Sequence, residues 1–467
     1  SPRTPMTPRQ KILLAVVAIA ALGASGCATI SRLNPFNGKD GAKEVASEGE
    51  RISIVAADQK LEPAAALKGV DFALPPVTPA ADWPLPGGTA ERSMGNLDAA
   101  PALSVAWRKS VGQPSKGGQN ITAPPVAAGG RIFTMDGEAG VAAHDAKTGA
   151  PVWRVNLRPN DNKRDREGFG GGLAYAAGKL YVTSGYRLVA ELNADTGAAI
   201  WRTRTEQPIH AAPTVVGGRV MAVSLDNVLL TFDATTGAPG WSYQALSESA
   251  RILAASSPAV SGDTVVASFG SGELVALRAT NGNDLWNVAL SRANRSSALS
   301  EIRDIAGRPV IYSGDVFAVS HSGVFAATDL RTGQTRWNLP VVGITSPLPA
   351  GDVVYVMAED GRLVCASRES GQVYWISDLN AGFVGKRKGG FLKIGGRKAI
   401  RPIWSAPILV NNRLILAGSS GQLASVDAKT GAIQRRVELG APVLLTPIAA
   451  GDMIYVVTDK AQLIALR

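Results

Sequence analysis

The chain has 467 residues, of which 45% are hydrophobic and 18% charged, with 51 glycines and 28 prolines. This balance excludes an intrinsically disordered chain and indicates a turn-rich globular protein. Two cysteines exclude a disulfide scaffold and a four-thiolate metal site. The net charge is +10, but the cations are spread along the chain. No nucleic-acid groove is therefore predicted.

The N-terminus has the pattern of an export signal. Arg9 and Lys11 come before eleven apolar residues (12–22), and small residues then lead to Cys27. A basic stretch, a short apolar stretch and small residues before a cleavage point are typical of a secretory signal peptide. The apolar stretch is shorter than the about 20 residues that span a bilayer. We therefore expect residues 1–26 to be a removable signal peptide.

Residues 24–27, Ala-Ser-Gly-Cys, resemble the bacterial lipobox. The resemblance implies that Cys27 becomes the first residue of the mature protein and carries acyl chains that anchor it in a membrane. The lipobox usually has Leu where this chain has Ala24, and a plain secretory signal with an incidental cysteine is the alternative. Lipoproteins of enteric-type bacteria that stay in the inner membrane have Asp where this chain has Ala28. The resemblance therefore implies a lipid anchor in the outer membrane, on its periplasmic face.

The following segment, 27–100, shows little hydrophobic periodicity and is rich in Ala, Pro and Gly. This composition is typical of a tether between an anchor and a folded body. Two short stretches could dock on that body: residues 50–55 alternate like a strand, and Trp83 offers an aromatic anchor between Asp82 and Pro84. We predict that the folded domain covers residues 101–467.

That domain is periodic. A glycine followed four residues later by tryptophan recurs at spacings of 48, 40, 45, 51 and 38 residues, and a seventh glycine, Gly431, follows after 60 residues with Arg435 in the tryptophan position. These spacings are close to the 40–50 residues of a four-stranded propeller blade. The six complete copies are Gly149/Trp153, Gly197/Trp201, Gly237/Trp241, Gly282/Trp286, Gly333/Trp337 and Gly371/Trp375.

Each copy predicts a hairpin. In the clearest copies an apolar run ends in Asp, and Thr-Gly follows, as in Asp145 to Gly149 and Asp233 to Gly237. Asp can accept hydrogen bonds from backbone amides in the turn, and Gly adopts positive φ without a Cβ penalty. We place this hairpin between the third and fourth strands of a blade. A second hairpin signal lies upstream, for example at residues 216–220.

The two ends of the domain complete one further blade. Three strand-like runs follow Gly431, at 442–445, 454–457 and 463–466, and residues 103–107 form a strand-like run that ends in Trp107. Joined, they make an eighth four-stranded blade and leave no free sheet edge. The sequence therefore predicts an all-β fold, an eight-bladed propeller of four-stranded antiparallel blades that is closed by N- and C-terminal strands.

The repeated motif Ala-x-Asp-x-x-Thr-Gly-x-x-x-Trp resembles the docking motif of pyrroloquinoline quinone (PQQ) propellers. The resemblance implies that the tryptophans pack between neighbouring blades; here they are Trp107, Trp153, Trp201, Trp241, Trp286, Trp337 and Trp375. Such enzymes also need Ca²⁺ ligands, a catalytic Asp and usually a vicinal cysteine pair, and this chain has no Cys-Cys. The three histidines are scattered and suggest no metal site. We predict no catalytic residues, no cofactor and no metal, and keep a PQQ-dependent periplasmic dehydrogenase as the alternative.

Lipobox, tether and eight blades together resemble the BamB family, lipoproteins of the machinery that inserts β-barrel proteins into the outer membrane. The resemblance implies a non-catalytic scaffold that binds BamA and other components of the complex, and also unfolded outer-membrane proteins. In the family, loops between blades grip BamA; here these are 246–256, 290–308 and 377–401. The matching contact residues are Arg251, Leu253 and Asp304. The charged ones are equally typical of an ordinary solvated loop.

The third loop is strongly basic. Residues 386–401 carry seven cations and no acid: Lys386, Arg387, Lys388, Lys393, Arg397, Lys398 and Arg401. One hypothesis is that this segment meets an acidic partner surface or anionic lipid headgroups. The alternative is a flexible basic hairpin with no partner.

Overall fold

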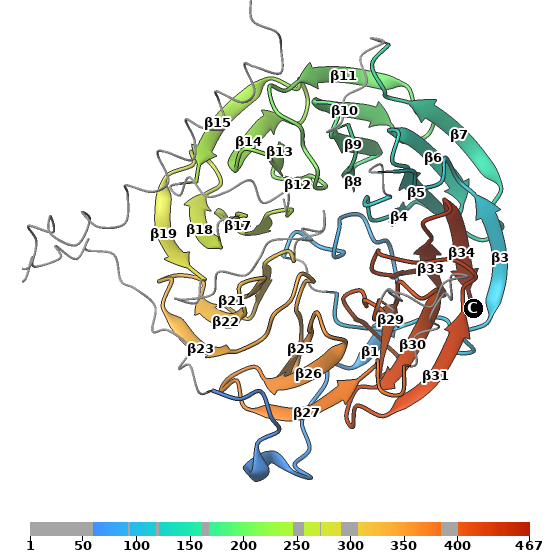
Figure 1. Ribbon diagram of the computed structural model, residues 1–467. Helices are drawn as coiled ribbons and strands as arrows, with labels where there is room; N and C mark the ends of the chain where they lie inside the picture. The colour runs from blue at the N-terminus through green and yellow to red at the C-terminus, as the bar shows by residue number, and fades with distance from the viewer. Residues whose placement is uncertain are drawn as a thin grey trace, which may run out of the picture. The chain divides into compact units, whose positions relative to one another are not determined.

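The computed structural model describes residues 59–91, 94–117, 121–160, 168–245, 256–270, 272–290, 307–383 and 400–467. Apart from one short 3₁₀ helix, η2 (Ala65–Leu67), the regular structure in these ranges is β-strand. The strands form eight sheets around a common centre (Figure 1). The predicted eight-bladed, all-β propeller is confirmed.

We number the blades one to eight along the chain, each with its innermost strand first. Blades one to four contain β4 (Val126–Ala128), β5 (Arg131–Met135), β6 (Gly140–Asp145) and β7 (Pro151–Asn156); β8 (Gly171–Ala176), β9 (Lys179–Ser184), β10 (Leu188–Asn193) and β11 (Ala199–Arg204); β12 (Thr214–Val216), β13 (Arg219–Val223), β14 (Val228–Asp233) and β15 (Pro239–Gln244); and β16 (Ala259–Ser261), β17 (Thr264–Ser268), β18 (Glu273–Arg278) and β19 (Asp284–Ala289).

Blades five to eight continue the ring. They contain β20 (Val310–Tyr312), β21 (Asp315–Ser320), β22 (Val324–Asp329) and β23 (Thr335–Leu339); β24 (Leu348–Ala350), β25 (Val353–Met357), β26 (Arg362–Ser367) and β27 (Val373–Asp378); β28 (Ile408–Val410), β29 (Arg413–Ala417), β30 (Gln422–Asp427) and β31 (Ile433–Glu438); and β32 (Ile448–Ala450), β33 (Met453–Val457), β34 (Gln462–Leu466) and β3 (Val105–Ser110). In blade seven, β1 (Val77–Pro79) and β2 (Asn96–Asp98) extend the sheet inside β28.

The burial of each strand follows its position in the blade. The middle strand β6 is buried at five of its six residues, whereas the outermost strand β7 alternates between exposed and half-buried residues. Middle strands lie between two neighbouring blades and are covered on both faces, so they need apolar side chains on both faces. An outermost strand has one face towards solvent and keeps the alternation of a half-buried strand.

The repeated glycine is the contact point between blades. The ring of Trp337 in blade five lies so close to Gly371 of blade six that a Cβ on this glycine would be 2.6 Å from it. Gly371 also has φ +74°, which other residues adopt only with strain. The Trp337 Nε1–H donates to the carbonyl of Arg368 at 2.9 Å. The other tryptophans of the series, from Trp107 to Trp375, meet the glycine of the following blade in the same way.

Arg435 interrupts the tryptophan series for a structural reason. Blade eight has no hairpin between its two outer strands, because β34 and β3 come from distant parts of the chain. Blade eight therefore has no hairpin glycine at this position against which a tryptophan from blade seven could pack. Arg435 lies exposed and instead donates a hydrogen bond to the carbonyl of Ala102, just before β3.

The hairpin aspartates also determine how the fold responds to acid. The Asp233 carboxylate accepts hydrogen bonds from the N–H groups of Thr236 and Thr235, at 2.9 and 2.8 Å, and these bonds lower its pKa. The pKa of Asp145 is lowered in the same way, chiefly by the Thr148 N–H. A lowered pKa contributes stability that is present above the unfolded-state pKa of about 3.9 and is lost as pH falls through the folded-state pKa.

We therefore expect the urea midpoint to fall as pH is lowered from about 5 towards 2, and to fall less in Asp233→Asn. Asn193 occupies the same position in blade two and accepts the corresponding bonds from Asp195 and Thr196, so asparagine can replace the aspartate without titrating. Urea unfolding followed by tryptophan fluorescence across this pH range measures the difference. Parallel pH curves for the two proteins would contradict the expectation.

Part of the segment expected to be a tether is instead packed inside the ring. Trp83 is 3% exposed and pairs with Ala127 of β4, and β2 pairs in parallel with β28. Between these points the backbone carbonyls of this segment accept hydrogen bonds from Tyr175 (β8), Val260 (β16) and Ile311 (β20). The docking expected at Trp83 is present, whereas residues 50–55 lie outside the described residues.

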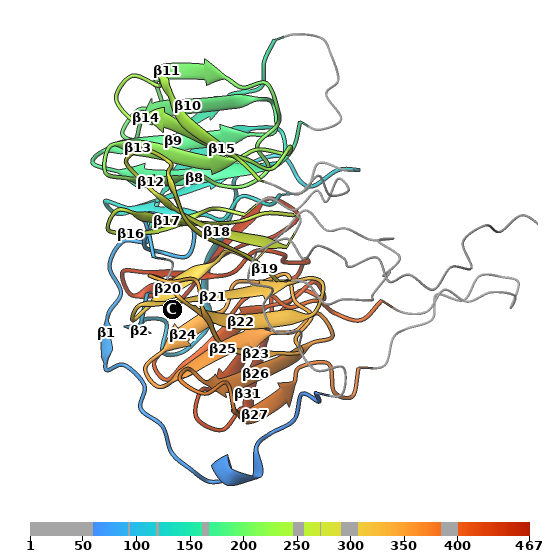
Figure 2. The ribbon, with the colours of Figure 1, turned by 90° about the vertical axis from the view of Figure 1, so that its left-hand side faces the viewer.

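The structure thus differs from the boundary expected at residue 101. The described residues between 80 and 99 cross the centre of the ring, as the blue trace shows in Figure 1, and contact the innermost edges of six blades. The segment lies at the end where the first and second strands of each blade are joined, because it also bonds to Asn411 and Gly451 in two of those hairpins. Figure 2 shows the preceding residues, in blue, along the same side of the ring. One end of the central channel is therefore occupied.

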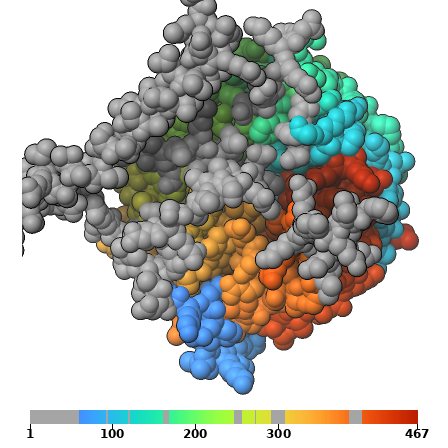
Figure 3. All heavy atoms as spheres, viewed as in Figure 1, coloured from blue at the N-terminus to red at the C-terminus, as the bar shows by residue number. Residues whose placement is uncertain are grey.

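Residues 59–70 lie further out. They form the blue protrusion beside the orange strands of blade six in Figure 3, where the Ala64 N–H donates to the carbonyl of Val373. No helix in the described part of the chain is long and apolar enough to cross a membrane.

Candidate functional site

The connections between blades bring distant parts of the sequence together at the other end of the channel. Within a blade the chain runs outwards from the innermost to the outermost strand and then returns to the innermost strand of the next blade. The ends of these return connections therefore gather around the channel mouth. Three of them contain the loops expected to bind a partner.

A proline marks the end of nearly every return connection. It stands directly before the innermost strand in seven of the eight blades: Pro125, Pro213, Pro258, Pro309, Pro347, Pro407 and Pro447. Proline fixes φ and lacks the N–H that a strand interior needs, so it suits the first position of an edge strand. The one or two residues before each proline consequently lie at the channel mouth, at the equivalent place in each of these blades.

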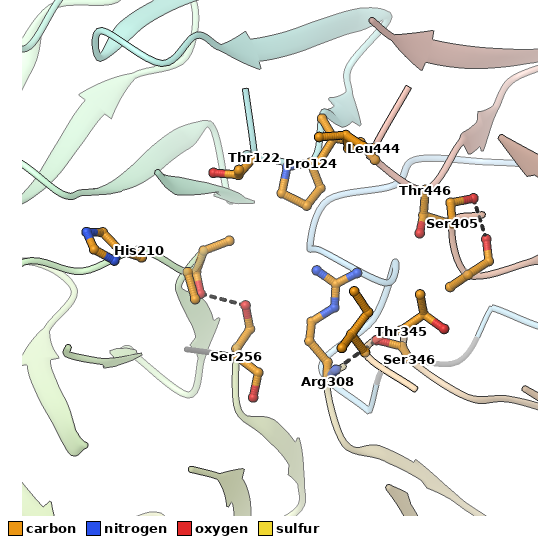
Figure 4. Close-up of a pocket in the computed structure, with 16 residues that line it drawn as sticks. Thr122, Pro124, His210, Ser256, Arg308, Thr345, Ser346, Ser405, Leu444 and Thr446 are labelled. Carbon is orange, nitrogen blue, oxygen red and sulfur yellow. Dashed lines mark hydrogen bonds between the residues drawn. The ribbon is translucent and has the colours of Figure 1, made fainter. Parts of the chain in front are cut away.

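These residues line a cavity of about 60 Å³ (Figure 4). Most of the lining is small or carries a hydroxyl. Ser256 and Ser257 directly follow loop residues 246–255, Arg308 closes the second loop, and Ser405 follows the third. The three expected partner loops therefore end at one common cavity.

Arg308 is the one Lys or Arg side chain among the described residues of the lining. Its backbone N–H donates to the Ser346 hydroxyl of blade six at 2.9 Å, and Gly307 before it lies so close to the Thr345 carbonyl that a Cβ would be 2.6 Å away. The guanidinium points into the cavity towards Thr122 and Pro124 (Figure 4). Among the described residues it has no ion-pair partner, and its Nε is buried without a hydrogen bond. Burial lowers the pKa of Arg308 to about 10.

Only some of the residues predicted to contact a partner or a membrane lie within the described ranges. Cys27, Arg251, Leu253, Asp304 and the basic residues 386–398 lie outside the described residues. Arg401 is described and is exposed. Two apolar side chains border the basic segment, Phe383 at 42% and Ile400 at 81% exposure. The basic segment is thus flanked by exposed apolar groups.

Sequence reasoning missed Arg308 as a site residue. The repeat nevertheless singles out this residue. The residue before the proline is Pro, Ala, Ser or Thr in the other copies and Arg in this one alone. The glycine and tryptophan of the repeat mark contacts between blades, whereas Arg308 lies at the end of a loop. Among the described residues, no group of three or more His, Cys, Asp or Glu side chains is placed to hold a metal ion.

The family model described as outer membrane protein assembly factor BamB matches residues 98–165, 137–377 and 395–467. The chain belongs to the BamB family. The BamB protein of Burkholderia pseudomallei is 26% identical over 79% of this chain and 89% of its own length. The crystal structure of BamB from Moraxella catarrhalis matches with a TM-score of 0.58 and 18% identity, over 77% of this chain and 97% of that one.

Quinoprotein enzymes share the fold of this BamB-family chain. Quinohemoprotein alcohol dehydrogenase from Comamonas testosteroni matches with a TM-score of 0.61 and 15% identity, over 80% of this chain and 76% of that one. At this identity the similarity concerns the fold alone. The match to the dehydrogenase therefore supports the propeller fold only. Any catalytic activity has to be judged from the residues of the site.

The central cavity does not fit PQQ and Ca²⁺. Its volume of about 60 Å³ is smaller than the roughly 150 Å³ that accommodates one benzene ring, and PQQ is a tricyclic compound. Ca²⁺ takes several oxygen ligands, usually including carboxylates, and the described residues that line the cavity include no Asp or Glu.

Proposed function

We propose that this chain is an assembly factor for outer-membrane β-barrel proteins and acts as a non-catalytic scaffold. The observation that carries the proposal is the family match, which covers residues 98–377 and 395–467. The central cavity supports it, because the described residues of its lining include none of the carboxylates of a quinoprotein site. A propeller offers what a scaffold needs, which is a rigid ring that holds loops in defined positions.

The proposed partner is BamA, gripped by the face on which loops 246–256, 290–308 and 377–401 end. The convergence of the three loop ends on one cavity supports this choice. In the proposal Arg251, Leu253 and Asp304 make the contacts, and other components of the complex and unfolded outer-membrane proteins are further partners.

The proposed location is the periplasmic face of the outer membrane, where acyl chains on Cys27 anchor the protein. The basic segment 386–401 then meets an acidic partner surface or lipid headgroups. Exposed Phe383 and Ile400 at its two ends support a contact role for this region, since exposed apolar groups beside cations suit a surface that is both charged and apolar.

The test is capture of BamA from native membranes with the tagged full-length chain. We expect recovery of BamA by the wild type and a loss on the order of tenfold or more in the double variant Arg251→Glu/Leu253→Ala, because truncated anchor residues and reversed charges weaken an interface strongly. Arg331→Glu is the matched control, since Arg331 is exposed in the hairpin between β22 and β23, at the opposite end of the ring from this face.

Two outcomes would count against the proposal. Failure to recover BamA even after crosslinking would exclude it as the partner. Equal recovery by wild type and double variant would exclude these two residues as contacts. The dehydrogenase alternative is tested separately, by adding PQQ and Ca²⁺ to the purified protein; saturable binding with dye reduction would favour the enzyme.

A further inference from the structure

The centre of the ring holds a partly buried positive charge without a countercharge among the described residues. Arg308 comes from blade five, and its guanidinium has no ion-pair partner among the described residues. No Asp or Glu is among the described residues that line the cavity. The Arg308 Nε is buried, and a guanidinium that is partly withdrawn from water is stabilised by an anion that pairs with it.

A second unsatisfied group lies across the cavity. Thr122 belongs to blade one, which is opposite blade five in a ring of eight. Its Oγ1 is buried and has no hydrogen-bond partner among the described residues. Figure 4 shows Thr122 and Arg308 on opposite sides of the same space. Buried polar groups are nearly always satisfied, so both groups are suited to hydrogen-bond a molecule that enters the cavity.

The cavity has the size for a small ligand. Its volume of about 60 Å³ is several times the roughly 10–15 Å³ that one water molecule needs, which leaves room for an ion of four or five heavy atoms. The N-terminal segment occupies the opposite end of the channel. Serine and threonine hydroxyls in the lining, such as Thr446, can add further donors.

We propose that the channel mouth is a binding site for a small oxyanion, held by the Arg308 guanidinium with the Thr122 hydroxyl as a second donor. A guanidinium presents two parallel N–H groups that match a carboxylate, sulfate or phosphate. The site is independent of the proposed scaffold function, because it does not require BamA.

The test is calorimetric titration of the full-length chain with sodium sulfate, phosphate and acetate, at constant ionic strength set with chloride. We expect saturable binding of at least one of the three. Binding of sulfate or phosphate identifies an inorganic ion as ligand, and binding of acetate alone identifies a carboxylate. Arg308→Met should weaken binding on the order of tenfold or more, because it removes a charged hydrogen-bond donor.

Three further variants separate binding from folding. Thr122→Val keeps the shape of the side chain and should weaken binding less than Arg308→Met does. Arg308→Lys keeps the charge, loses the paired donors and should bind more weakly than wild type. Arg204→Met removes an exposed cation from β11 and should bind like wild type.

The thermal midpoint gives an independent readout. Saturating anion should raise it in wild type and leave it unchanged in Arg308→Met, since a ligand stabilises only the protein that binds it. The proposal is overturned if none of the three anions binds wild type saturably, or if Arg308→Met and Thr122→Val both bind with wild-type affinity. If Arg308→Met does not fold, the Thr122→Val and Arg308→Lys titrations decide.

Discussion

Removal of residues 463–467 is expected to abolish the cooperative unfolding transition of this protein. Leu463, Ile464 and Leu466 are fully buried, and β34 pairs with β33 on one side and β3 on the other. Burial of three large aliphatic side chains contributes about 1.5–3 kcal/mol each. Without β34, β3 also loses its partner and the ring stays open. The combined loss is comparable to the about 5–15 kcal/mol that stabilises a typical domain.

The measurement is urea unfolding followed by tryptophan fluorescence, together with the soluble fraction after expression. Ile433→Ser is the control, because Ile433 lies 38% exposed on the outermost strand β31 and its replacement should leave the midpoint nearly unchanged. A truncated chain that unfolds cooperatively at the wild-type midpoint would show that the ring does not depend on closure by β34.

Trp337→Ala is expected to lower the free energy of unfolding by about 3–5 kcal/mol, the usual range for removing a large aromatic side chain from a core. Trp337 is 9% exposed, and its ring centroid lies 5.2 Å from that of Phe325 and 6.2 Å from that of Phe317. Its removal leaves a cavity between blades five and six, and the Arg368 carbonyl loses its donor.

Arg435→Ala is the matched control for this variant. Arg435 occupies the equivalent position in blade seven but is exposed and faces no glycine, so its loss should cost less than about 1 kcal/mol. The two free energies of unfolding, measured in urea, should therefore differ severalfold. Equal values would mean that the tryptophans are not the main contacts between blades.

The blade count could be predicted because its signals are local and repeated. Asp233 to Gly237 specifies a turn by its own hydrogen bonds and backbone angles, and Trp241 follows at a distance that the strand dictates. The closure of blade eight followed from the same counting. Each of these motifs can be recognised even when the surrounding residues differ between blades, because it depends on a few residues at a fixed spacing.

The centre of the ring could not be predicted in the same way. The described residues between 80 and 99 attach in part through backbone hydrogen bonds, such as the one from the Val260 N–H to the Ala90 carbonyl, and backbone bonds leave no periodic pattern in the side chains. Arg308 occurs once, and it lines the same cavity as Thr122 only because the ring closes. This placement depends on the tertiary fold, so the local sequence around either residue carries no sign of it.

The Asn96 side chain donates to Asn412, 316 residues further along the chain. An early segment is thus enclosed by strands that are made much later, and ordering so long a stretch carries a large loop-closure entropy. High contact order slows folding. We therefore expect the chain to fold slowly and to reach its native state only once both the threaded segment and the last blade are available. The first and the last parts of the propeller therefore reach their native packing together.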